Sequence, residues 1–441
     1  MTDSASAPTP ASAVPSSRPP LWTRNFTLYF TARIASLLGD AMLPVALSVA
    51  MLTFGYGVSA VGYALGAWMG AFALFVVFGG VLADQVHPRP LMIAADAVRC
   101  ALIGATAFAF AIGRPELWFI ICVTALGGLA TAMFQPGVNG LVPKVAADPQ
   151  SANGVLRVAQ GISTMAGPAL AGLLVAAASP ALAFAVTAGT FAASGLSLLA
   201  LRLGAYEIDR SASTLENLKT GWYEFRSRSW LWAVVLIWWV LGVFVWGPIV
   251  PLGAASVTGA HGVAAFGYAE GAFGAGCVLG GLAAIRIRPA RPLFGGAVAM
   301  FLFPMMPLSA GLAPDLGLPV LLLGYAVSGS GWAFWGVQWA TTVQTQIPED
   351  RLNRVSAYEI AGSILAVPLG QVIAGPASSL VGIHELLLLA ALISTGCAAA
   401  LIATAPIRRL RRAKPVADGS PSPRLWPPTT EGEGTCPSRT A

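Results

Sequence analysis

Long apolar stretches, each followed by a short polar or charged segment, make up most of the chain from residue 25 to residue 406. A helix that crosses about 30 Å of hydrocarbon at 1.5 Å per residue needs about 20 apolar residues. Twelve stretches reach that length, and we expect each to form a transmembrane helix. Their ranges are 25–52, 58–82, 90–112, 117–138, 155–178, 181–202, 231–256, 263–285, 292–312, 318–342, 358–381 and 386–406.

The composition supports a membrane protein, because 56% of the residues are hydrophobic and only 10% are charged, against about 25% in soluble proteins. The five cysteines are scattered without paired spacing, and the three histidines lie in predicted loops, so we expect no metal site. The chain carries no phosphate-binding G-x-x-x-x-G-K-[S/T] loop and no combination of nucleophile and base. It is therefore expected to be neither an enzyme nor an ATP-driven pump, and no cofactor is expected.

The basic residues predict the orientation of the helices. With a cytoplasmic N-terminus, the loops on the cytoplasmic side carry 12 Lys or Arg residues and the opposite loops carry only Arg114. This asymmetry follows the positive-inside rule and places both termini in the cytoplasm, with membrane lipid rather than nucleic acid as the partner of the basic residues.

Five regions follow from this topology. We expect a disordered cytoplasmic tail at 1–23, a six-helix bundle at 24–202, and a second six-helix bundle at 230–406, followed by a disordered tail at 407–441. The charged segment 203–229 between the bundles contains a capping-box pattern at 213–216 and apolar residues at helical spacing, which predicts an amphipathic helix; a flexible linker is the alternative.

The two bundles share a sequence pattern. Residues 79–83 (GGVLA) with 89–91 (RPL) recur as 280–284 (GGLAA) with 291–293 (RPL), an offset of about 200 residues. The pattern occupies the same end of the second and the eighth predicted helix. We therefore expect an all-α membrane protein of 12 transmembrane helices in two six-helix parallel repeats, the architecture of secondary transporters of the major facilitator type.

The segment 79–89 between the second and third helices resembles the loop signature of the major facilitator superfamily, with Gly80, Asp84 and Arg89 at matching positions. In that family the acidic residue is thought to engage the start of helix 11. The resemblance therefore implies that Gly80, Asp84 and Arg89 act as a conformational switch, with Arg354 as a partner.

Helix 5 resembles the exporter-type signature of the same superfamily through Gly154, Gly167, Pro168 and Gly172. Small residues let helices approach closely, and a proline inside a helix removes one backbone hydrogen bond, so these residues are expected to form a hinge. Further segments, 39–40, 218–232 and 344–356, look like the macrolide-efflux and enterobactin-exporter-like branch of drug:proton antiporters.

A charge inside a membrane span costs a few kcal/mol, and three ionisable residues of the predicted spans are our candidates for a functional role: Arg33 and Asp40 in the first helix and Glu270 in the eighth. Arg33 and Asp40 are seven residues apart, about 10 Å along the axis, which favours a water-filled space between them. We assign all three to proton coupling or to the charge of the cavity. Alternatives remain: Arg33 could reach the cytoplasmic surface, and Glu270 could be permanently protonated. Asp96 and Arg99, three residues apart, are interpreted as a local structural pair beside Asp84.

Helices 7 and 10 are rich in tryptophan, and in the major facilitator superfamily these helices line the central cavity with helices 1 and 4. The resemblance therefore implies an aromatic cavity suited to a bulky amphipathic substrate, although ordinary helix packing would also explain the tryptophans. The candidate cavity residues are Gln135, Asn139, Trp238, Trp246, Trp332, Trp335 and Gln338.

Together these observations predict a monomeric, multi-pass transporter of a bacterial plasma membrane. We expect proton-coupled efflux of a lipophilic or amphipathic small molecule, such as an antibiotic, a secondary metabolite or a siderophore, by alternating access. The expected cellular consequence is drug resistance. Two alternatives are a proton-coupled importer of a small organic solute and a sensor that has the fold but transports nothing.

Overall fold

Helices account for nearly all of the chain that the computed structural model describes, which comprises residues 21–85, 88–146, 149–203, 222–223, 225–347, 355, 359 and 362–412. No strand occurs in these ranges. The helices are α1 (Arg24–Thr53), α2 (Val58–Gln85), α3 (Pro88–Ile112), α4 (Leu117–Val145), α5 (Pro149–Ala177), α6 (Pro180–Leu199), α8 (Ser229–Leu241), the π-helix η1 (Gly242–Trp246), α9 (Gly247–His261), α10 (Val263–Arg286), α11 (Pro292–Ala299), the 3-10 helix η2 (Met300–Leu302), α12 (Met305–Gly311), α13 (Leu318–Gln346), α15 (Ala366–Val381), α16 (Ile383–Ala403) and α17 (Ala405–Arg409).

The described chain contains 12 helical segments long and apolar enough to cross a membrane, which confirms the number of spans predicted from the sequence. Two of them are composite. The seventh span, Ser229–His261, joins α8, η1 and α9, and the ninth, Pro292–Gly311, joins α11, η2 and α12.

Local sequence determines several helix ends. The Thr23 hydroxyl accepts a hydrogen bond of 3.2 Å from the Phe26 amide and caps α1, and Ser179 caps α6 in the same way, with Pro180 in the first turn. Between α9 and α10 the chain turns at Gly262, whose φ of 88° lies in the left-handed region that glycine adopts without strain.

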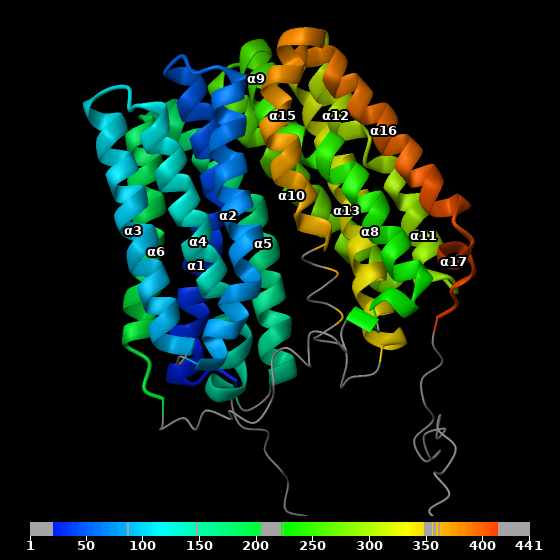
Figure 1. Cartoon of the computed structure of the whole chain (residues 1–441), viewed down its shortest axis with the longest axis horizontal. Coiled ribbons are helices and arrows are strands. Elements are labelled where there is room, and N and C mark those ends of the chain that lie inside the picture. Colours follow the sequence, from blue (N-terminus) through cyan, green and yellow to red (C-terminus); the bar gives the residue numbers. More distant parts are fainter. Residues whose placement is uncertain are drawn as a thin grey trace, which may run out of the picture.

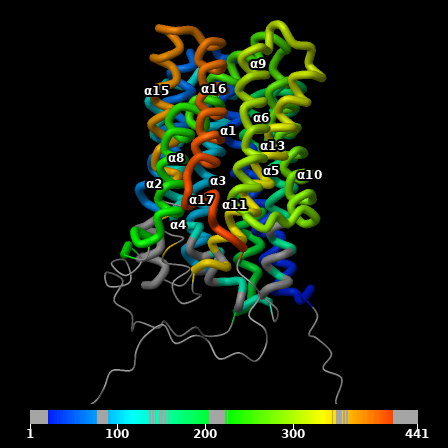
Figure 2. The backbone as a smooth tube through the Cα atoms, turned by 90° about the vertical axis from the view of Figure 1, so that its right-hand side faces the viewer, coloured from blue at the N-terminus to red at the C-terminus, as the bar shows by residue number. Residues whose placement is uncertain are grey.

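The helices form two halves that lie side by side, α1 to α6 in the first and α8 to α17 in the second (Figure 1). In the tube view the long helices run roughly parallel, and both ends of the described chain lie at the same end of the molecule (Figure 2). We call this the terminal end. The opposite end, where short loops such as 54–57, 113–116 and 178–179 connect the helices, is called the tight-loop end.

The two halves contact each other closest to the tight-loop end, through α5 with α10 and α2 with α15. A Cβ on either Gly172 or Gly267 would lie 2.7 Å from the Cα of the other, so only glycine fits on both sides of this crossing. A Cβ on Gly66 would likewise lie 2.7 Å from the Val372 side chain. Toward the terminal end the ribbons of the two halves diverge (Figure 1).

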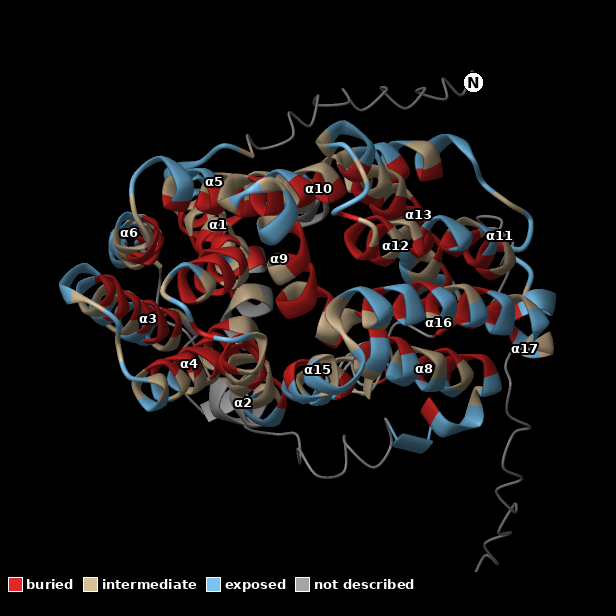
Figure 3. Ribbon diagram, turned by 90° about the horizontal axis from the view of Figure 1, so that it is seen from above, coloured by how far each residue is buried: buried red, intermediate tan, exposed pale blue. Residues whose placement is uncertain are grey.

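Burial separates inner helices from outer helices. Seen along the helices, α1 is buried on most of its surface, whereas α3, α6, α11 and α16 expose their outer faces (Figure 3). Many exposed side chains are large and apolar, such as Phe108, Leu196 and Leu392. An apolar outer surface of this kind suits contact with lipid.

The second helix continues to Gln85, three residues beyond the expected end, so the segment after Gly80 is helical rather than an open loop. Most of the predicted amphipathic linker helix lies outside the described residues, as do 1–20 and 413–441 of the predicted tails 1–23 and 407–441. The start of the second tail is helical, because α17 extends to Arg409.

Candidate charge network and aromatic cluster

Arg99 on α3 forms the centre of a charge network in the first half. Its guanidinium donates to both carboxylate oxygens of Asp40 on α1, at 3.0 and 3.3 Å, and to the Ser36 hydroxyl at 3.2 Å. It also pairs with Asp96, one turn earlier on α3. Ser194 on α6 donates to the second oxygen of Asp96 at 2.6 Å. The network thereby connects α1, α3 and α6.

The network is buried to different degrees. The side chains of Arg99 and Asp96 are 2% and 0% exposed, whereas that of Asp40 is 21% exposed. The rings of Phe134 on α4 and Phe191 on α6 each lie 4.4 Å from the Arg99 guanidinium carbon and exclude water from it. Asp40 is therefore the member of the network that other molecules can reach.

Simple spacings produce this arrangement. Ser36 and Asp40 are four residues apart on α1, and Asp96 and Arg99 are three apart on α3, so each pair shares a helix face. Gly39 lets α1 approach α6, because a Cβ there would lie 3.0 Å from the Phe191 ring. Glycine at position 39 thus allows the close packing of α1 against α6, beside the face of α1 that carries Ser36 and Asp40.

Arg99 is the direct partner of Asp40, a contact that was not predicted from the sequence. Arg33 is buried on α1 with its guanidinium carbon 5.9 Å from the Phe134 ring. The pairing of Asp96 with Arg99 was expected from their spacing, but its extension to Asp40 was not, because the sequence carries no signal for the contact between α1 and α3.

A cluster of aromatic rings occupies the second half. The Trp332 ring on α13 lies 5.8 Å from Trp238 on α8 and 4.7 Å from Trp246 in η1, between ring centroids. Trp335 lies 5.3 Å from Trp238, and Phe303 lies 5.1 Å from Trp246. The four candidate tryptophans are therefore brought together into one cluster.

The cluster has a buried side and an accessible side. Trp335 is buried, and so is Gln338, one turn further along α13, whereas Trp238, Trp246 and Trp332 are half-buried. Packing thus accounts for Trp335 and Gln338, and three tryptophans retain exposed ring surface. The indole N–H of Trp246 is buried and has no hydrogen-bond partner among the described residues.

Two further candidate cavity residues lie on α4. Gln135 is half-buried and directly follows Phe134, which contacts Arg99. Asn139 lies one turn further on, and its side chain falls outside the described part of the chain.

Of the proposed switch residues, only Arg89 has a described side chain. Its guanidinium donates to the carbonyls of Leu198 and Leu199, at 2.9 and 2.8 Å, and so caps the C-terminus of α6. Gly80 lies in α2, while the side chain of Asp84 and the whole of Arg354 lie outside the described residues.

The proposed hinge residues lie on α5, which remains one helix from Pro149 to Ala177 with Pro168 inside it. Gly167 faces α1, since a Cβ there would lie 2.6 Å from the Ala41 Cβ, and Gly172 faces α10. Gly154 lies near the terminal end of the same helix. The glycines of α5 thus serve contacts within the first half and between the halves.

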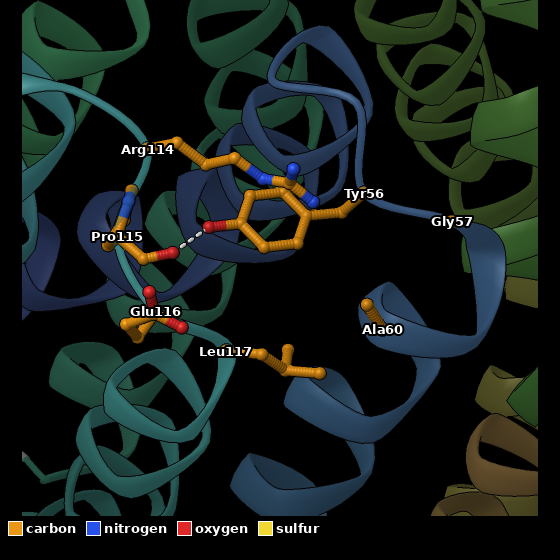
Figure 4. Close-up of a pocket in the computed structure, with 7 residues that line it drawn as sticks. All are labelled: Tyr56, Gly57, Ala60, Arg114, Pro115, Glu116 and Leu117. Atoms are coloured by element: carbon orange, nitrogen blue, oxygen red, sulfur yellow. Dashed lines mark hydrogen bonds between the residues drawn. The ribbon is translucent and has the colours of Figure 1, made fainter.

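A separate pocket of about 370 Å³ opens between loops at the tight-loop end (Figure 4). The Arg114 guanidinium carbon lies 4.3 Å above the Tyr56 ring, and the Tyr56 hydroxyl donates to the Pro115 carbonyl. Its lining residues all come from 56–60 and 114–117, beside the contact of α2 with α15, because a Cβ on Gly375 would lie 2.2 Å from the Ser59 Cα. In the described part of the chain, no group of three His, Cys, Asp or Glu side chains could hold a metal ion.

Solved structures with similar folds are transporters. A crystal structure of the nucleoside transporter NupG superposes with a TM-score of 0.68 and 14% identity, covering 88% of this chain and 100% of that chain. An inward-facing, occupied structure of a bacterial homologue of the human lysosomal transporter Spinster gives a TM-score of 0.69 and 14% identity, covering 89% and 98%. At these identities the similarity concerns the fold alone.

Sequence comparison identifies relatives of the chain. The chain is 26% identical to macrolide efflux protein A of Streptococcus pyogenes over 394 residues, covering 83% of this chain and 93% of that protein. It is 22% identical to the uncharacterized MFS-type transporter YvqJ of Bacillus subtilis (strain 168), covering 82% and 88%. The sequence model of the Major Facilitator Superfamily matches residues 29–358. With its twelve apolar helices and this match across most of its length, the chain is a multi-pass membrane transporter of small molecules that belongs to the Major Facilitator Superfamily.

Proposed function

We propose that the protein is a proton-coupled exporter of a lipophilic or amphipathic small molecule. In this proposal the two halves rock about a central site and expose it alternately to the two sides of the membrane. The similarity to a macrolide efflux protein supports export rather than import.

The observation that carries the proposal is that Arg99 pairs with two carboxylates, those of Asp40 and Asp96. Asp96 is fully buried and also accepts from Ser194, whereas Asp40 is partly exposed. If Asp40 takes up a proton, Arg99 keeps a charged partner in Asp96 and is not left as a lone buried charge, which would cost several kcal/mol. Asp40 can therefore exchange a proton while the network stays intact.

The contacts between the halves support alternating access. They lie toward the tight-loop end, and the basic residues favour a cytoplasmic terminal end. On that orientation the structure corresponds to a conformation closed to the outside of a bacterial plasma membrane, with both termini in the cytoplasm. The opposite conformation would require Gly172 and Gly267 to separate.

Expression in an efflux-deficient bacterium, challenged with a panel of antibiotics that includes a macrolide, tests export directly. We expect the wild type to raise resistance to at least one compound and Asp40→Asn to abolish that resistance with the same amount of protein in the membrane. Glu116→Gln, which changes an exposed acid at the tight-loop end, is the matched control and should behave as wild type.

Proton coupling is tested in de-energised membrane vesicles that carry a preset proton gradient. Addition of the exported compound should dissipate the gradient with wild-type protein and leave it unchanged with Asp40→Asn. Full export by Asp40→Asn would refute the role of this carboxylate, and substrate movement that ignores the gradient would identify a uniporter instead.

A further inference from the structure

Glu270 differs from Asp40 and Asp96, the other two acids away from the ends of the described membrane spans. Asp40 and Asp96 both pair with Arg99, but Glu270 has neither a hydrogen bond nor an ion pair with any described residue. An ionised carboxylate without a partner is costly inside a membrane. No described residue therefore neutralises Glu270, and a protonated carboxyl or a bound cation from outside the protein would satisfy it.

The faces of α10 show where Glu270 lies. Gly267 and Gly274 face α5, because a Cβ at Gly267 would lie 2.7 Å from the Gly172 Cα, while Gly276 and Gly280 pack against the backbone of α13. At about 100° per residue, Glu270 lies between these two contact faces. The third face of the helix, which includes Tyr268 and Leu279, is exposed. Glu270 is therefore on the side of α10 that faces the interior of the molecule.

A second polar group without a partner lies at the same depth. Glu270 and Tyr325 are the eighth residues of α10 and α13, both of which begin at the tight-loop end. Tyr325 is 0% exposed, and its hydroxyl has no hydrogen-bond partner among the described residues. The next residue, Ala326, packs against α10, since a Cβ on Gly276 would lie 1.9 Å from the Ala326 carbonyl oxygen. A buried hydroxyl that lacks a partner is rare and costs about 1–3 kcal/mol. The pair of Glu270 and Tyr325 is thus an incomplete polar site.

The aromatic cluster begins one turn from Glu270. Phe273, three residues later on α10, has its ring centroid 6.0 Å from that of Trp246, which in turn lies 4.7 Å from Trp332. Residues three apart on a helix are neighbours on its surface, so Glu270 lies beside Phe273, the edge of the aromatic cluster. Trp246 and Trp332 keep part of their ring surface exposed.

We propose that Glu270, Tyr325 and the rings of Trp246, Phe273 and Trp332 form a binding subsite for a planar aromatic cation. This inference rests on the proposed export function, whose substrate class it narrows. In the occupied site the carboxylate neutralises the positive charge of the ligand and accepts a hydrogen bond from the Tyr325 hydroxyl, which has no partner among the described residues without a ligand. The electron-rich ring faces stabilise the cation and stack on its flat body. Asp40 remains the proton-exchanging acid, so the two halves divide coupling and substrate binding between them.

The test uses equilibrium binding to the purified full-length protein in detergent, followed by quenching of tryptophan fluorescence. The probes are ethidium, a permanently charged planar cation, and hydroethidine, its uncharged reduced form, kept under nitrogen. We expect wild-type protein to bind ethidium roughly tenfold more tightly than hydroethidine. Glu270→Gln should remove this preference by weakening ethidium binding, and Tyr325→Phe should reduce it.

Asp315→Asn changes an exposed acid at the tight-loop end and serves as the control, with affinities equal to wild type. Trp332→Leu should weaken the binding of both probes, because it removes a ring and leaves the carboxylate. Equal affinity of wild-type protein for the two probes would overturn the proposal without any variant. An unchanged preference in Glu270→Gln would overturn it as well.

Failure of this inference can be told apart from failure of the export function. The binding measurement requires no transport, so a protein that binds ethidium through Glu270 but exports nothing contradicts only the proposed function. If the protein exports only uncharged compounds and does not bind ethidium, the result contradicts the proposed cation subsite and leaves the export function standing. If Glu270→Gln abolishes the export of charged and uncharged compounds alike while wild-type protein shows no preference, Glu270 is a proton carrier.

Discussion

Replacing Arg99 by methionine offers a quantitative test of the charge network. The substitution removes the hydrogen bonds to Asp40 and Ser36, the pairing with Asp96 and the contacts with Phe134. It leaves two carboxylates, one of them fully buried, without a cation.

The magnitude follows from the burial of the pairs. At an effective dielectric constant of 20, two charges 4 Å apart attract by about 4 kcal/mol, and removing one partner of a buried pair costs about 3–5 kcal/mol. The first half is a bundle of domain size, for which each kcal/mol lowers the melting temperature by about 2–4 °C. We therefore expect Arg99→Met to lower the melting temperature by about 10 °C.

The assay is thermal unfolding of the purified protein in detergent, with binding and export measured on the same preparations. Arg288→Met, a change at an exposed arginine, should leave the melting temperature unaltered. Combining Arg99→Met with Asp40→Asn and Asp96→Asn should restore most of the stability, because a buried ion network can be replaced by neutral groups at little cost. It should not restore export. A melting temperature of Arg99→Met equal to wild type would refute the reasoning, as would a triple variant no more stable than the single one.

Two further predictions concern the contact between the halves. In Gly172→Leu the new Cβ would lie 2.7 Å from the Cα of Gly267, so the variant should hold the tight-loop end open and reduce export. Gly189→Leu changes a glycine with nothing within 4 Å and should be tolerated. Labelling of a cysteine at the interface by an impermeant thiol reagent would report the opening, and unchanged labelling would contradict it. Gly375→Leu, where a Cβ would lie 2.2 Å from the Ser59 Cα, should force α2 and α15 apart at the same end and reduce export, and export equal to wild type would show that this contact need not close.

The fold could be predicted from the sequence because the membrane imposes a length on each helix. Twelve apolar runs translate directly into twelve spans, and the recurrence of residues 79–91 at 280–293 indicates the repeat. The predicted helix ends differ from the structure by several residues in places, as at Gln85, because a helix satisfies its own hydrogen bonds and can continue beyond the apolar run.

The site could be predicted only in part. Asp40 and Glu270 are conspicuous as charges in apolar runs, and this property can be read from the sequence. The partnership of Asp40 with Arg99 depends on how α1 and α3 pack, and 59 residues separate the two side chains along the chain. For the same reason the sequence does not distinguish Trp335, which is buried, from Trp332, which keeps exposed surface.

The π-helix between Gly242 and Trp246 changes the register of the seventh span. In a straight α-helix, Trp238 and Trp246 would differ by about 80° in direction, since eight residues exceed two full turns. A π segment accommodates one additional residue, so the two side chains point as if they were seven apart, on one face. Both rings therefore reach Trp332. Deleting Phe244, which lies between Val243 and Val245, should convert the segment into ordinary α-helix and leave both tryptophans facing the cluster. The seventh span can therefore lose one residue here while the side chains on either side of the deletion keep their directions.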